Sequence, residues 1–155
     1  MQLRVADAAD VPALLDMMAD FNRIEAIACD PVSAEPPLGR LLGAPELGLI
    51  GLIEHVERVE HVERGAELLG YGVLTWGFDL EYAGRDAFLT EFYLRPEVRG
   101  QGLAAAAIEL LLAEARRHAA LAVHLVVRHE NAPALRVYAK AGFVAPGRLL
   151  LTKKL

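Results

Sequence analysis

The chain has 155 residues, of which 54% are hydrophobic and 24% charged, and its formal net charge at pH 7 is −5. This composition predicts one folded domain over residues 1–155 and excludes a disordered or low-complexity chain. The negative charge argues against a nucleic-acid partner, because binding there depends on clustered Lys and Arg. No apolar run approaches the ~20 residues that span a bilayer. The single cysteine, Cys29, fits a reducing compartment, so we expect a cytoplasmic protein without a membrane partner.

Hydrophobic periodicity predicts a mixed α/β fold, a central sheet flanked by helices. Period-two runs indicate strands, and apolar residues spaced three and four apart indicate helices. In chain order the predicted elements are a strand at 3–5, a helix at 11–21, a brief helix at 38–42, strands at 47–53, 68–78 and 87–94, a helix at 101–119, a strand at 123–127, a helix at 132–141 and a strand at 149–155.

Two segments between these elements predict irregular structure. Residues 24–37 contain three prolines and predict a loop. Residues 54–65 hold a direct repeat, EHVERV followed by EHVERG, whose valines recur every three residues. That period suits neither a strand nor a long helix, so the repeat predicts a solvated hairpin connection. Its histidines, His55 and His61, lack a third ligand in the sequence, and we expect no metal.

Residues 99–104 place two glycines between a predicted strand and a long helix. Such a turn lets backbone N–H groups converge, and the helix dipole adds positive potential, so it can bind an anion. Glycines at a strand–helix turn can also serve geometry alone. The turn lacks the Gly-Lys-Ser/Thr ending of a Walker loop and the third glycine of a dinucleotide-binding fingerprint.

Val98-Arg99-Gly100-Gln101-Gly102-Leu103-Ala104 resembles the Arg/Gln-x-x-Gly-x-Gly/Ala motif of the GNAT superfamily of N-acetyltransferases, with Ala104 at the Gly/Ala position. The resemblance implies the fold of that superfamily and a transferase that uses acetyl-CoA as co-substrate without a metal. By the resemblance the turn binds the pyrophosphate and backbone near Leu94 pairs with the pantetheine arm. The implied cofactor-binding residues are Leu94, Arg99, Gly100, Gln101, Gly102, Leu103, Ala104 and Asn131.

A second motif follows about thirty residues later. Asn131 can cap a helix, Tyr138 lies almost two turns further along it, and Gly142-Phe143 comes next. An isolated helix tyrosine most often simply packs. This order, however, closely resembles the later GNAT motif, in which the tyrosine donates a proton to the departing thiolate of CoA. The resemblance therefore implies a catalytic Tyr138.

Glu91 is the acidic residue inside the strand before the turn, and it is the candidate base that deprotonates the amine. The alternative is a structural ion pair with an arginine. Residues 70–94 most resemble the diamine and spermidine acetyltransferases, which carry two adjacent acids on this strand. Here Thr90 replaces the first, and Thr90 and Glu91 should face opposite sides of the sheet unless a bulge intervenes.

Asp79 matches an acidic position associated with polyamine binding in that subfamily. With Glu81, Asp86 and Glu91 it would form an acidic approach for a cation, and apolar walls would come from Trp76, Phe78 and Tyr82. The predicted substrate-binding residues are thus Asp79, Trp76 and Tyr82. The alternative is a solvated connection whose charges meet only water.

Direct transfer of an acetyl group to a primary amine of a small molecule is the leading functional prediction, and a homodimer is the expected assembly. Acetylation of a protein N-terminus or lysine, and a non-catalytic CoA-binding sensor, are the alternatives. His129 is a weaker candidate base, and Cys29 as a nucleophile lacks a visible base partner.

Overall fold

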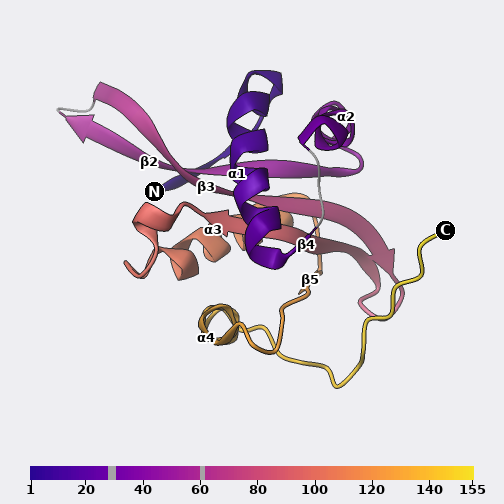
Figure 1. Ribbon diagram of the computed structural model, residues 1–155. Helices are drawn as coiled ribbons and strands as arrows, with labels where there is room; N and C mark the ends of the chain where they lie inside the picture. The colour runs from indigo at the N-terminus through magenta and orange to yellow at the C-terminus, as the bar shows by residue number, and fades with distance from the viewer. Residues whose placement is uncertain (28–30, 60–61) are drawn as a thin grey trace.

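The computed structural model describes residues 1–27, 31–59 and 62–155. In these ranges one sheet has the strand order β1-β2-β3-β4-β5, with helices on both faces (Figure 1). β1 to β4 pair antiparallel, and β5 joins β4 in parallel through the crossover helix α3. The elements are β1 (Gln2–Val5), α1 (Val11–Glu25), α2 (Pro31–Leu42), β2 (Gly48–Val59), β3 (Val62–Asp79), β4 (Gly84–Leu94), α3 (Leu103–Arg117), β5 (Ala122–Leu125) and α4 (Ala132–Lys140), with 3-10 turns at Ala8–Asp10 and Pro96–Val98.

Each face of the sheet has its own core, which confirms the predicted sheet between helices. On one face α1 and α2 cover the strands, and the fully buried Leu14 and Met17 pack in the same cluster as Tyr71. On the other face α3 buries Ile108 and Leu111 beside Leu74. Side chains alternate along each strand, so successive residues of β3 feed the two cores in turn.

The prediction of a loop over residues 24–37 is wrong for residues 24–25 and 31–37, while residues 26–27 are irregular as predicted and residues 28–30 lie outside the described residues. α1 continues to Glu25, and α2 begins at Pro31 and contains Pro36 and Pro37. Proline disfavours a helix interior because it lacks an N–H donor and crowds the preceding turn. Burial of Leu38, which is 4% exposed, on the core of the sheet outweighs that local cost.

The repeat at 54–65 forms a hairpin as predicted, but its strands are longer than predicted. β2 runs to Val59 and β3 starts at Val62, so the strand ladder continues through most of the repeat. Register shifts after Ile53 and after Glu57 absorb the mismatch between a period of three and a ladder of period two. The paired ends project beyond the other strands as a ribbon (Figure 1), where no core demands apolar alternation.

The predicted strand at 149–155 is wrong too. This segment has no strand structure, and Leu149 and Leu151 are 85% and 87% exposed. An apolar run becomes a strand only where a neighbour accepts its backbone hydrogen bonds. The C-terminal segment instead runs past the sheet as a loop (Figure 1). Separately, none of the helices in the described ranges combines the length and apolar character that crossing a bilayer requires.

Candidate active site

β4 and β5 remain paired over only part of the length of β4. Their register runs from Asp86 with Ala122 to Leu89 with Leu125, and the described residues show no pairing beyond it. β4 continues to Leu94, whereas the chain after Leu125 leaves the sheet toward α4. The two strands therefore diverge. Two cavities, described below, open where they separate.

A cavity of about 650 Å³ lies between the end of β4, the start of α3 and α4. Gly100 and Gly102 in its wall have φ angles of +75° and +76°, and a Cβ on either would meet no atom within 4 Å. The turn thus requires glycine and leaves open space above its backbone. Gly102 caps α3 without a side-chain hydrogen bond, so the first N–H groups of α3 stay available for an anion. The lining includes these predicted cofactor-binding residues: Leu94, Arg99, Gly100, Gly102, Leu103, Ala104 and Asn131.

Two of the predicted cofactor-binding residues, Gln101 and Arg99, use their side chains in hydrogen bonds to backbone carbonyl groups of this chain. The Gln101 side chain donates 2.9 Å to the Glu97 carbonyl and does not line the cavity. The Arg99 Nε donates 2.8 Å to the Leu94 carbonyl, and its guanidinium lies 5.1 Å from the centre of the Tyr93 ring. In this conformation the Leu94 carbonyl therefore accepts a hydrogen bond from Arg99. The same bond fixes the arginine side chain beside the glycine turn of residues 99–104.

Glu91 reaches the face covered by α1 because β4 carries a bulge. Val73 pairs with Glu91 and Leu74 pairs with Leu89, so Thr90 is an extra residue in the ladder. A one-residue insertion exchanges the two faces for every residue that follows. Leu89 accordingly packs in the α3 core, and Glu91 points to the other side.

The Glu91 carboxylate is held by a tyrosine. The Tyr71 hydroxyl donates 2.5 Å to Glu91 Oε2, so the alternative of an arginine partner is not what the described residues show. Burial raises the pKa of Glu91 above its ordinary value, and the hydrogen bond from Tyr71 partly opposes this. A carboxylate whose pKa is raised is a better proton acceptor than an ordinary one.

Tyr138 is positioned by a capped helix. The Asn131 Oδ1 accepts 3.2 Å from the Ala134 N–H at the start of α4, and Pro133 occupies its first turn. Further along, the Tyr138 ring packs edge-on against Phe143, with ring centres 5.8 Å apart. Burial raises the pKa of Tyr138 to about 12, so the phenol keeps its proton at neutral pH and can donate it.

A smaller cavity of about 310 Å³ adjoins the first, and Tyr138 lines both. Thr90 and Glu91 also line the smaller cavity. The two predicted catalytic side chains, Glu91 and Tyr138, therefore border the same space. Glu25 at the end of α1 also lines both cavities, and its charge contributes to the raised pKa of Tyr138.

Glu25 was not among the residues predicted from the sequence. A signal for it exists, because Glu25 lies seven residues after Met18 and continues the apolar stripe of α1. An acidic side chain on the inward face of a helix needs a function or a partner. The sequence prediction ended this helix four residues early, at Phe21, and so placed Glu25 in a loop.

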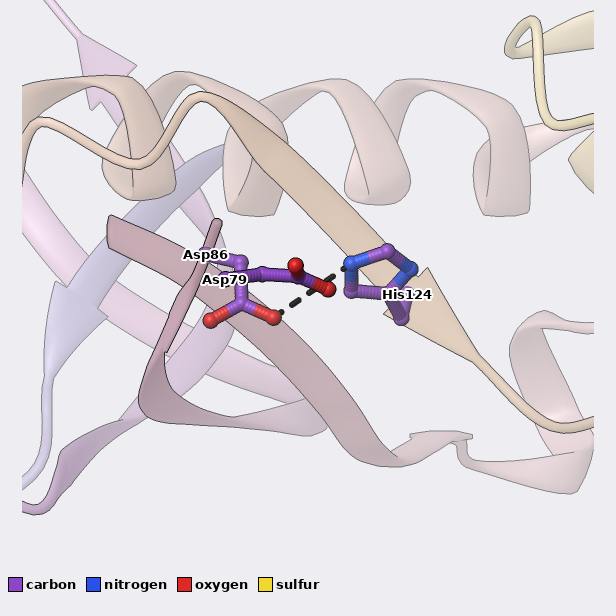
Figure 2. A group of neighbouring side chains, drawn as sticks. All are labelled: Asp79, Asp86 and His124. Carbon is purple, nitrogen blue, oxygen red and sulfur yellow. Dashed lines mark ion pairs between the residues drawn. The ribbon is translucent and has the colours of Figure 1, made fainter. Parts of the chain in front are cut away.

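The structure does not bring the predicted substrate-binding residues to this site, because Asp79, Trp76 and Tyr82 line neither cavity. The Trp76 ring stacks on His118 at 4.8 Å, on the face covered by α3. Asp79 lies instead with Asp86 and His124, the one group of described residues that could hold a metal ion (Figure 2).

Of the other residues proposed for that acidic approach, Glu91 lines the smaller cavity, but Phe78 and Glu81 line neither cavity. Phe78 is 74% exposed, and Glu81 pairs with Arg148 at 2.5 Å. His129, the weaker candidate base, is exposed and lines neither cavity. The prediction for Cys29 falls outside the described residues, as does that for His61.

Comparison with known proteins agrees with this geometry. Uncharacterised N-acetyltransferases of Mycobacterium bovis and of two Mycobacterium tuberculosis strains are each 41% identical over 80 residues, which make up 52% of this chain and 48% of the relative. The match thus spans about half the length of these curated relatives.

Solved structures resemble the whole chain. An integron cassette protein, HFX_CASS3, from the mobile metagenome of Cole Harbour Salt Marsh is 35% identical, with a TM-score of 0.81 over 99% of this chain and 90% of that one. A predicted acetyltransferase of Clostridium acetobutylicum, solved with acetyl-CoA, shares the fold at 19% identity and a TM-score of 0.72, over 98% and 95% of the two chains. The family model for the acetyltransferase (GNAT) family matches residues 38–143, and the chain belongs to that family.

Proposed function

We propose that this protein transfers an acetyl group from acetyl-CoA to a primary amine of a small molecule. The observation that carries the proposal is the junction of two cavities at Tyr138. The larger cavity has the glycine turn of residues 99–104 in its wall, which can bind an anion, and the smaller has a buried carboxylate, Glu91. The larger cavity thus fits an acetyl donor that carries phosphate groups, and the smaller cavity fits an acceptor amine that must lose a proton.

The residues divide the chemistry between them. Acetyl-CoA would supply a thioester, and its pyrophosphate would bind the glycine turn and the N-terminus of α3. Glu91 accepts a proton from the ammonium form of the acceptor, directly or through water. The free amine forms a C–N bond to the acetyl carbon as the C–S bond breaks. Tyr138 donates its proton to the sulfur, the acylated nitrogen releases its second proton to water to become the amide, and Tyr138 later regains a proton from solvent.

The charges around the smaller cavity support a cationic acceptor. Glu25 and Glu91 contribute two carboxylates to its wall, and Arg128 contributes one cation. A diamine or polyamine, which the resemblance of residues 70–94 also favours, would suit this balance. We further expect the enzyme to work in the cytoplasm as a homodimer.

The test is thiol release from acetyl-CoA with a panel of polyamines, amino acids, aminoglycosides and peptides. We expect turnover with a small amine, and a loss of kcat of about 100-fold or more in Tyr138→Phe, the size typical of general acid catalysis. The Kd of acetyl-CoA, measured by calorimetry on the same variant, should stay within about threefold because Phe keeps the ring.

Other results would point elsewhere. Turnover confined to peptides would favour a protein acetyltransferase. Tight binding of acetyl-CoA without turnover on any amine would favour a sensor. Full activity in Tyr138→Phe would remove that residue as the acid.

A further inference from the structure

Three side chains outside the cavities converge at the far end of the sheet. One ligand atom from each of Asp79, Asp86 and His124 lies within 4.8 Å of the others, and the three groups point toward one another (Figure 2). Asp86 is five residues before Glu91 on β4, or roughly 16 Å at ~3.3 Å per residue. We propose that these three residues form a binding site for a divalent transition-metal ion, with zinc as its best probe.

Strand register accounts for the convergence. In the β3–β4 hairpin Gly77 pairs with Asp86 and Asp79 lies two residues beyond Gly77, so both carboxylates share one face. In the parallel pairing His124 lies opposite the residue two places after Asp86, and thus on the same face again. Three strands therefore each contribute one donor. Gly77 makes room, because a Cβ there would lie 2.4 Å from Asp86 Oδ1.

Two atoms of the cluster are buried without a hydrogen-bond partner. Asp86 Oδ1 and His124 Nε2 each expose less than 1 Å² and accept or donate no hydrogen bond among the described residues. The whole side chains of Asp86 and His124 remain 18% and 32% exposed, which leaves a path for a small ion. Asp86 Oδ1 lies over Gly77, on the side of the carboxylate away from His124, whereas His124 Nε2 faces Asp86 Oδ2 within the cluster (Figure 2). A buried polar atom without a partner is costly, so an ion that engages this nitrogen would be stabilising.

The distance between the His124 imidazole and the Asp86 carboxylate favours an ion that bridges them over a direct hydrogen bond. His124 Nε2 lies 3.4 Å from Asp86 Oδ2, longer than the ~2.8 Å of a charge-assisted hydrogen bond. Two ligands that each lie ~2.1 Å from a tetrahedral zinc ion are about 3.4 Å apart. The observed distance is the edge of such a tetrahedron.

The donor types narrow the choice of ion. An imidazole nitrogen with two carboxylates suits zinc and its transition-metal neighbours better than Mg²⁺ or Ca²⁺, which prefer oxygen alone. Asp79 Oδ1 accepts 2.7 Å from the Glu81 N–H, which orients that carboxylate, and the Tyr82 ring lies edge-on to His124 at 5.2 Å. A bound ion would clamp β5, whose pairing with β4 covers four residues, to the β3–β4 hairpin.

The test titrates zinc chloride into the chelator-stripped full chain by calorimetry, without acetyl-CoA. We expect one equivalent to bind, and zinc at about 100 times its Kd to raise Tm by about 5–10 °C. His124→Gln and Asp86→Asn should each weaken binding at least about tenfold. His118→Gln is the matched control. His118 Nε2 also lies 3.4 Å from a carboxylate, that of Glu114, but among the described residues His118 belongs to no group of three side chains that could hold a metal ion.

Circular dichroism of each variant establishes that it is folded before titration. Absence of zinc binding to the wild type, or equal binding by His124→Gln, would overturn the proposal. Stabilisation by spermidine but not by zinc, lost in Asp86→Asn, would make the cluster an amine subsite and would overturn it as well. None of these readouts depends on acetyl transfer, so they are independent of the proposed enzymatic function.

Discussion

Glu91 is the residue whose environment most affects the proposed chemistry. Burial raises its pKa because the charged carboxylate loses hydration, whereas the Tyr71 hydroxyl stabilises the charged form and lowers it. Tyr71 is itself fully buried, and both burial and the nearby carboxylate raise the pKa of its phenol. The tyrosine therefore stays a donor, and the pair sets the pH at which Glu91 can accept a proton.

The first prediction follows from these opposed effects. A base works only when deprotonated, so kcat/KM for the amine should rise with pH through the pKa of Glu91. Tyr71→Phe removes the hydrogen bond that favours the carboxylate, and the rising limb should move to higher pH by about one to two pH units. The measurement is the pH profile of kcat/KM from pH 5 to 9.

Glu91→Gln is the matched comparison, because it keeps the shape of the side chain and removes the titration. We expect its kcat/KM to fall at least about 100-fold and the limb assigned to Glu91 to vanish. A limb that persists unchanged in Glu91→Gln, or that moves to lower pH in Tyr71→Phe, would show that another group is the base.

At the scale of elements, the turn before α3 combines a backbone requirement with the binding role proposed for it. Both glycines of the turn are in the left-handed region, and the space above them is open. The bulge at Thr90 acts in a similar way on β4, since it turns Glu91 to the face opposite Leu89. Small local irregularities thus place the functional groups on otherwise regular elements.

Gly102→Ala should weaken acetyl-CoA binding more than it weakens the fold. The φ of +76° disfavours any Cβ by about 1–2 kcal/mol, and the new methyl group would stand where a phosphate approaches. We expect the KM for acetyl-CoA to rise at least about tenfold.

Gly147→Ala is the control, because Gly147 has a φ of +74° and equally open surroundings but lies outside the cavity. Thermal unfolding should show comparable losses in the two variants, while the KM changes only in Gly102→Ala. An equal rise of KM in both would mean that backbone strain, rather than the site, is responsible.

At the scale of the whole molecule, α3 packs so closely on the sheet that one strand residue must lack a side chain. A Cβ at Gly72 would lie 2.5 Å from Leu111 Cδ1, and Leu111 is 1% exposed. The position of α3, and with it the end of the glycine turn of residues 99–104, depends on this contact between helix and β3.

A double-mutant cycle tests this packing. Leu111→Ala leaves a cavity and should cost about 2–5 kcal/mol of unfolding free energy, and Gly72→Ala overpacks the same place and should cost about 1–3 kcal/mol. The double variant should lose less than the sum by at least about 0.5 kcal/mol, because the new methyl group occupies vacated space. Urea unfolding measures all three, and strict additivity would contradict the contact.

The sequence by itself determined the parts of this protein whose chemistry is local. The glycine turn of residues 99–104 and the capped helix with Tyr138 are each set within a few residues, by backbone conformation and by helix capping. Apart from the strand predicted at 149–155, the order of strands and helices was also readable, since periodicity reports which face of an element is buried. These features predicted the family that the comparisons support.

Tertiary structure decided what depends on residues far apart in the chain. Burial against the sheet made a helix of the proline-containing residues 31–42, and backbone pairing carried β2 and β3 through the valine repeat. The longer α1 brought Glu25 to the cavities, and strand register gathered Asp79 with His124 instead of with Glu91. Propensity and spacing describe neighbours in sequence, whereas these outcomes follow from packing free energy and strand register, which are defined only once the chain has folded.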